Sequence, residues 1–94
     1  MTEEDNIYGV VRTAEELGGL ARAHRKHRRL TLETVSGLGN LSTRFLSEFE
    51  RGKETAEIGK VLKALRTLGL EVTVQPRGRV APAHGPGETG TQPP

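Results

Sequence analysis

Residues 31–53 read TLETVSGLGNLSTRFLSEFERGK, and this stretch decides the fold. Thr31 and Ser42 each precede a run with apolar residues at helical spacing, and a hydroxyl there caps a helix by accepting a bond from a backbone N–H. Three residues that tolerate left-handed backbone separate the two runs: Gly37, Gly39 and Asn40. The stretch therefore predicts two short helices joined by a sharp turn.

The apolar positions of these two helices predict how they pack. The inward positions are Leu32, Val35 and Leu38 in the first helix and Phe45, Leu46 and Phe49 in the second. Val35 and Leu46 meet at the crossing, where Ser36 is small enough to permit a steep angle. The outward positions of the second helix are Thr43, Arg44, Ser47, Glu48 and Arg51. A helix exposed in this way can enter the major groove of DNA.

Helices are also predicted on both sides of this pair. Thr13 and Glu16 form a capping-box pattern, which predicts a helix up to about Arg28. Its inward positions are Leu17, Leu20, Ala21 and His24. Thr55 is expected to start a last helix that stops at Gly69. Its inward positions are Ile58, Val61, Leu62, Leu65 and Leu68. The sequence thus predicts a mainly all-α, four-helix domain over residues 13–75.

A single β-strand is predicted after the last helix. Residues 70–75 read LEVTVQ, in which Leu70, Val72 and Val74 alternate with polar residues, the period of a half-buried strand. Residues 7–12, IYGVVR, could pair with it, but the same strand of a second copy is the simpler partner. The alternation therefore predicts a homodimer with these three apolar residues at the interface.

The two ends of the chain lie outside this domain. Residues 1–12 are interpreted as an N-terminal arm. All five prolines fall at or after position 76, and residues 76–94 hold little apolar surface, so we expect a disordered tail rich in proline and glycine. The acidic start and the absence of a long apolar run predict a cytoplasmic protein without a membrane segment, at the nucleoid if it binds DNA.

One basic block stands out on a nearly neutral chain. The formal net charge is +2, with 14 Lys and Arg against 12 Asp and Glu. The block comprises Arg22, Arg25, Lys26, Arg28 and Arg29, beside His24 and His27. It is either a solvated helix face or an electrostatic footprint for a polyanion. Because these side chains spread around the helix, we expect one or two of them, Arg28 included, to contact phosphate.

The residue types argue against catalysis and metal binding. There is no cysteine, so thiolate metal sites cannot form, and His24 and His27 lack zinc-site spacing and are interpreted as solvated or interfacial. No catalytic triad or phosphate loop can be built, so we expect no enzyme, cofactor or metal. Three aromatic residues, two Phe and one Tyr, are too few for single-stranded nucleic-acid binding. Arg51 and Lys53 suit the end of a helix, where they oppose its dipole, and Glu50 is expected to pair nearby; Lys53 could also touch phosphate.

Residues 44–77, RFLSEFERGKETAEIGKVLKALRTLGLEVTVQPR, carry a resemblance to the Xre-type helix-turn-helix repressors and, within them, to the HipB-like antitoxins. The resemblance covers residues 13–77. It implies a lambda-repressor-like domain that dimerises through its C-terminal strands and binds an inverted-repeat operator in double-stranded DNA. It further implies repression of an operon that encodes the protein itself and a HipA-like serine/threonine kinase toxin, which the antitoxin binds and neutralises.

The resemblance also implies which residues meet DNA. Ser42, Thr43, Arg44 and Ser47 match the family's recognition positions; Arg44 would pair with guanine and Ser42 with phosphate. The sequence departs from the family at Leu32, where many members have a phosphate-binding Gln. Asn40 replaces the usual glycine of the turn, and Gly39 stands where an apolar residue is common. The alternatives are a stand-alone Xre-type regulator and a scaffold used only for protein interaction.

Overall fold

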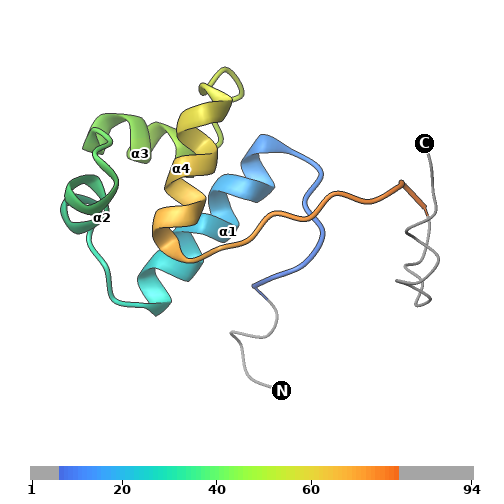
Figure 1. Cartoon of the computed structure of the whole chain (residues 1–94), viewed down its shortest axis with the longest axis horizontal. Coiled ribbons are helices and arrows are strands. Elements are labelled where there is room, and N and C mark those ends of the chain that lie inside the picture. Colours follow the sequence, from blue (N-terminus) through green and yellow to red (C-terminus); the bar gives the residue numbers. More distant parts are fainter. Residues whose placement is uncertain (1–6, 79–94) are drawn as a thin grey trace, which may run out of the picture.

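Hydroxyl side chains begin three of the four helices in the structure, a computed structural model that describes residues 7–78 (Figure 1). Thr13 Oγ1 accepts from the backbone N–H of Glu16, and the same contact in the next two helices joins Thr31 to Thr34 and Ser42 to Phe45. The helices are α1 (Ala14–His27), α2 (Leu32–Gly39), α3 (Thr43–Glu50) and α4 (Ile58–Leu68). The predicted four-helix domain and three of its helix starts are confirmed.

Two left-handed residues end helices where the sequence predicted. Asn40 ends α2 at φ 54°, which aspartate and asparagine tolerate better than most side chains. Gly69 ends α4 at φ 85°. The Glu16 carboxylate differs slightly from a capping box, because it accepts from the backbone N–H of Arg12 rather than from that of Thr13.

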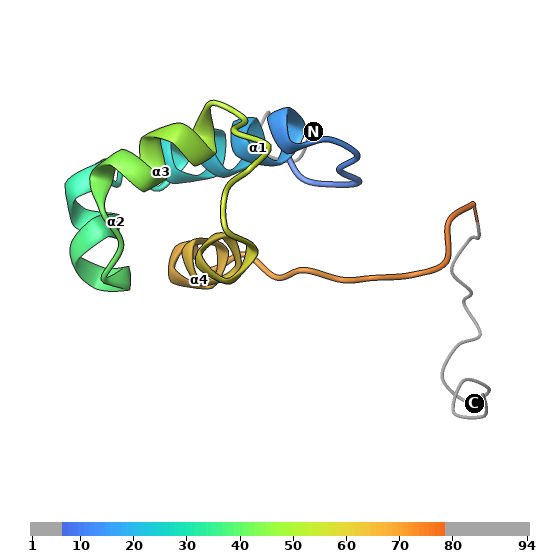
Figure 2. The ribbon, with the colours of Figure 1, turned by 90° about the horizontal axis from the view of Figure 1, so that it is seen from above.

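The core lies where the four helices meet. Figure 2 looks along the axis of α4. It shows α1 and α3 beside each other and α2 at the N-terminal end of α3. The buried apolar residues are Ala21, Val35, Leu41, Leu46, Phe49, Val61, Ala64, Leu65 and Leu68. Every helix contributes to this set, so the short helices are stabilised mainly by packing against one another.

Three residues predicted to face inward are instead exposed. Leu38 is 70% exposed because Gly39 takes the buried position at the end of α2, against Thr67 of α4. The last helix starts at Ile58 and not at Thr55, and Ile58 is 67% exposed and Leu62 41%. The buried side of α4 is a stripe at spacings of three and four that excludes both: Val61, Ala64, Leu65 and Leu68.

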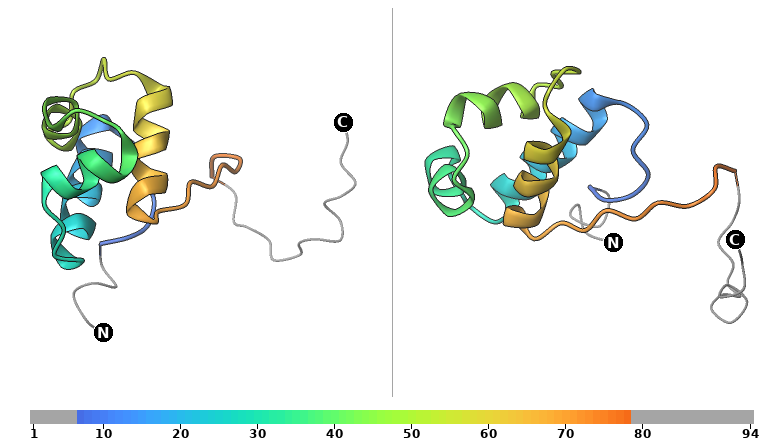
Figure 3. Two further views of the ribbon diagram at one scale, coloured as in Figure 1. Left: turned by 60° about the vertical axis from the view of Figure 1, so that its left-hand side comes forward. Right: turned by 45° about the horizontal axis from the view of Figure 1, so that its top comes forward.

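Residues 70–78 leave the end of α4 and run away from α2 and α3 (Figure 3). Within the described part of the chain, residues 70–76 form no regular strand and do not pair with residues 7–12. Val72 and Val74 are exposed there. A strand needs a hydrogen-bonding partner, so the pairing of two copies stays a prediction.

Residues 7–12 instead lie along α1, where Tyr8 contacts His24 and Arg12 contacts Glu16. Residues 1–6 of the predicted arm (1–12) and residues 79–94 of the predicted tail (76–94) lie outside the described residues. Among residues 7–78, none of the helices combines the length and the apolar character needed to span a bilayer.

Candidate nucleic-acid interface

The start of α3 presents the predicted DNA-binding residues to solvent. Ser42, Thr43 and Arg44 are exposed, and Ser47 follows one turn later and is half-buried. The Arg44 side chain is 87% exposed. The Ser42 oxygen accepts from the N–H of Phe45, which leaves its own O–H able to donate. These four side chains lie within about one and a half turns of one helix, as a recognition surface requires.

A close approach between helices sets the position of α3. A Cβ at Gly18 of α1 would overlap the carbonyl oxygen of Phe49, so the backbones of α1 and α3 lie closer than any larger residue would allow. Within α3, Phe45 stacks on Phe49 with ring centroids 6.2 Å apart. The close approach at Gly18 was not predicted, because Gly18 is in sequence one more residue of a helical run.

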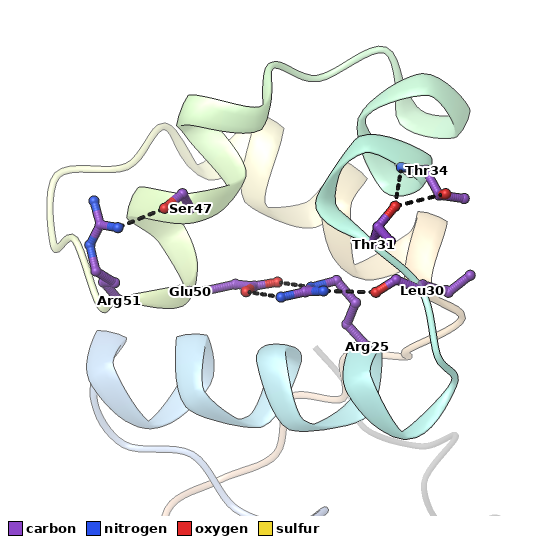
Figure 4. A network of polar contacts seen from close by, with 7 residues as sticks. All are labelled: Arg25, Leu30, Thr31, Thr34, Ser47, Glu50 and Arg51. Carbon is purple, nitrogen blue, oxygen red and sulfur yellow. Dashed lines mark hydrogen bonds and ion pairs between the residues drawn. The ribbon is translucent and has the colours of Figure 1, made fainter.

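An interior ion pair holds the same two helices together (Figure 4). Arg25 donates to both carboxylate oxygens of Glu50, from Nε at 2.7 Å and from a terminal nitrogen at 3.0 Å. Its other terminal nitrogen donates to the carbonyl oxygen of Leu30 at 2.7 Å. The hydrogen bond to Glu50 raises the pKa of Arg25. Arg25 is therefore a buried structural residue and not one of the cations available to DNA.

One further interpretation of the sequence was wrong, and another was right only in part. Glu50 does not pair locally at the helix end but reaches Arg25 across the domain. His24 is buried, which confirms its predicted inward position and excludes the solvated alternative: its Nε2 lies 2.8 Å from the carbonyl oxygen of Leu68, and its Nδ1 lies 2.8 Å from the Tyr8 hydroxyl. Because a carbonyl only accepts, Nε2 carries the proton in this contact.

A cationic groove lies beside α3. It has a volume of about 850 Å³ and is open to solvent, between the end of α1, the start of α2 and the end of α3. Its lining includes Arg22, Lys26, Arg29 and Arg51, with Thr31 and Ser47. Figure 4 shows Arg51 reaching toward Ser47, whose Oγ accepts its hydrogen bond at 2.6 Å. We call this surface the basic groove.

The other two predicted DNA-contacting cations lie elsewhere. Arg28 does not line the basic groove; it lies beside Gly69, where an added Cβ would come within 3.5 Å of its guanidinium. Lys53 follows α3, and its Nζ is 3.0 Å from a carboxylate oxygen of Glu48.

Glu48 joins Lys53 to Arg44. Arg44 Nε lies 3.3 Å from the second carboxylate oxygen, Oε2. The hydrogen bond from Lys53, and to a smaller extent the hydrogen bond from Arg44, lowers the pKa of the Glu48 carboxyl below its usual value. Glu48 was predicted only to face outward, so its two partners are a finding of the structure.

No group of three or more His, Asp or Glu side chains among residues 7–78 is arranged to hold a metal ion.

No protein-family model matches the sequence. An uncharacterized HTH-type transcriptional regulator of Sinorhizobium fredii, y4mF, is 38% identical over 64 residues, which are 68% of this chain and 84% of that protein.

Among solved structures, a HipB–O4 20mer complex and a HipA–HipB–O2–O3 complex each contain a chain with the same fold. Both superimpose with a TM-score of 0.70 at 16% sequence identity, over 74% of this chain and 99% of theirs. The lambda-repressor-like fold expected from the sequence is thereby confirmed.

Proposed function

Because this chain belongs to the HTH-type transcriptional regulators, a class of DNA-binding proteins and not of enzymes, we propose that it is a dimeric repressor of its own operon. The observation that carries the proposal is the exposed start of α3. Arg44 stands there with both terminal nitrogens unpaired among the described residues, as a bidentate contact with guanine O6 and N7 requires. Thr43 and Ser47 would contact neighbouring bases or phosphates.

The basic groove would receive the phosphate backbone beside the recognition helix. Arg22 and Lys26 of α1 and Arg29 just after it line this groove, as does Arg51, which follows the last residue of α3. We assign the phosphate contacts of α1 to these residues in place of Arg28. Such contacts position a protein on DNA without reading its sequence.

Ser42 and Lys53 would add phosphate contacts at the two ends of α3. Ser42 can donate its hydroxyl proton at a helix start, where the free backbone N–H groups already favour an anion. Lys53 is about half-exposed, so its ammonium can face a phosphate while it remains near Glu48. Together these contacts would fix the register of α3 in the groove.

Dimerisation would match the protein to an inverted repeat. The alternating residues Leu70, Val72 and Val74 belong to a segment that forms no strand among the described residues, and two copies of it could pair about a two-fold axis. The pairing would bury Val72 and Val74, which are exposed in one chain.

The operon would also encode a HipA-like serine/threonine kinase toxin that the protein binds and neutralises. The support is the shared fold with HipB, which one of the solved complexes contains together with HipA. A stand-alone regulator is the second candidate, favoured by y4mF, which is named only as a transcriptional regulator. Co-purification of the chain with a kinase encoded beside it separates the two.

A fluorescence-anisotropy titration tests DNA recognition. The full chain is titrated against its own upstream DNA and against a scrambled duplex at two salt concentrations. We expect promoter-selective binding that falls by about 5-fold or more in Arg44→Ala, since a bidentate pair contributes about 1–3 kcal/mol of discrimination. Arg66→Ala is the matched control, because Arg66 is an exposed arginine of α4 outside the basic groove. Equal binding to both duplexes by the unmodified protein would favour the interaction-scaffold alternative.

A further inference from the structure

The carboxylate of Glu48 lies between two cations at the recognition surface. One oxygen contacts Arg44 and the other contacts Lys53, and the carboxylate side chain is only 26% exposed. We propose that Glu48 is a positioning residue for DNA recognition, which holds the Arg44 guanidinium in its base-reading orientation before DNA is bound. This inference rests on the proposed function and adds a specificity-determining residue to it.

The geometry leaves the base-reading edge of Arg44 free. Glu48 engages only Nε, so the two terminal nitrogens stay available. A bidentate guanine contact can use those two nitrogens as a pair of parallel donors. Arg44 and Glu48 are four residues apart on α3, a spacing that places both side chains on one face of the helix. The tether therefore orients Arg44 without occupying the donors that it needs.

Lys53 fixes the carboxylate itself. The backbone N–H of Lys53 donates to the carbonyl oxygen of Glu48 at 3.1 Å, so the chain after α3 folds back over that residue. Its Nζ then reaches Oε1 at 3.0 Å. Glu48 is thus held from one side by Lys53 and in turn holds Arg44 from the other.

The charge balance permits this carboxylate to face DNA. An isolated carboxylate on a recognition surface would repel phosphate, but here two cations flank it, and the three groups together carry one positive charge. Removing Glu48 would raise the local positive charge, and any cation-rich surface binds all duplexes more tightly. General affinity and specificity are therefore expected to change in opposite directions.

Preorganisation explains why specificity would fall. Arg44 is 87% exposed, and an unrestrained arginine must be ordered to make a bidentate base contact, which costs about 0.5–1.5 kcal/mol. A complex with a scrambled duplex does not require that order. The cost would therefore fall only on the specific complex.

The test compares Glu48→Ala with Glu54→Ala in the full chain. Glu54 is an exposed carboxylate six residues away that forms no ion pair or hydrogen bond within residues 7–78, so its loss controls for charge alone. We expect the promoter-to-scrambled affinity ratio to fall about 2- to 12-fold in Glu48→Ala, the equivalent of ordering one long side chain. In Glu54→Ala the ratio should stay at the unmodified value. Glu48→Gln, which keeps one acceptor oxygen, should lie between them.

Two results would overturn the inference. If both alanine variants bind both duplexes more tightly and the ratio is unchanged, Glu48 acts only as a surface charge. If Glu48→Ala still lowers the ratio in an Arg44→Ala background, Glu48 reads a base itself, since a positioning residue acts only through Arg44.

A measurement without DNA separates this inference from the proposed function. The ¹⁵N relaxation of the Arg44 Nε–H group reports whether the guanidinium is ordered in the free protein. We expect order in the unmodified chain and in Glu54→Ala, and its loss in Glu48→Ala; unchanged relaxation in Glu48→Ala would refute the tether. If the unmodified protein fails to select its promoter, the repressor proposal fails, while this measurement still decides whether Glu48 orders Arg44.

Discussion

Arg25 of α1 and Glu50 of α3 form a two-point ion pair inside the domain, with their side chains 9% and 5% exposed. The pair lies beneath the basic groove, and both residues also line it. It therefore joins the helix that carries the groove cations to the helix that carries Arg44.

Loss of one partner should destabilise the fold strongly. Glu50→Ala would leave the Arg25 charge buried without its partner, and we expect the free energy of unfolding in urea to fall by about 3–5 kcal/mol. Glu57→Ala is the control, because its contact with Lys60 is exposed, and it should cost no more than about 1 kcal/mol. A loss of equal size in both variants would contradict the structural role of the pair.

Two adjacent glycines of α1 should respond in opposite directions to the same substitution. Gly18→Ala places a methyl group against the Phe49 carbonyl and should destabilise the domain by about 1–3 kcal/mol. Gly19→Ala meets no atom within 4 Å and should stabilise it by about 0.5–1 kcal/mol, because alanine favours a helix more than glycine does. Thermal unfolding of both variants measures the difference.

The salt dependence of DNA binding should identify the groove cations. Arg22→Ala, Lys26→Ala and Arg51→Ala should each weaken binding to all duplexes and reduce the slope of log K against log salt by up to about 0.9. Arg28→Ala, outside the basic groove, should leave the slope unchanged. If only Arg28→Ala reduces the slope of log K against log salt, Arg28 and not the basic groove contacts the phosphate.

Proline in the predicted dimer strand should separate the two copies. Val72→Pro removes a backbone donor from the ladder, and we expect a monomer by analytical ultracentrifugation. Val72→Thr keeps the N–H and a β-branched side chain, so it should remain dimeric. A Val72→Pro variant that stays fully dimeric would place the interface elsewhere on the domain.

The Glu48 carboxyl should titrate with a pKa below that of an ordinary glutamate, because Lys53 and Arg44 donate hydrogen bonds to it. Its pKa is lowered in the folded state, so the stabilisation from its pairs is complete above the unfolded pKa and is lost as pH falls through the lowered value. Carboxyl ¹³C shifts measured against pH give the midpoint. Lys53→Ala should move the midpoint upward, and an unchanged midpoint would contradict the Lys53 contact.

The order of the helices was predictable from the sequence because its signals are local. Thr13, Thr31 and Ser42 each cap a helix through a contact three residues away, and Asn40 ends α2 by its own backbone angle. Such contacts involve residues close in sequence, so they can be predicted without knowledge of how the helices pack. The exposed start of α3, with Arg44 at its centre, follows from the same local pattern.

The sequence by itself determined the four helices, the sharp turn and the exposed face of α3, whereas only the tertiary structure decided which polar residues enter the core. Arg25 belongs to a block of basic residues that looks uniform in sequence, yet a partner 25 positions away buries it. The inward position of His24 was predicted, but its partner, the carbonyl oxygen of Leu68, is 44 positions away. The exposure of Leu38 was likewise set by how α2 meets α4, where Gly39 takes the buried position. A polar side chain can be buried only where a hydrogen-bonding partner meets it, and such meetings between distant segments exist only once the helices are packed together.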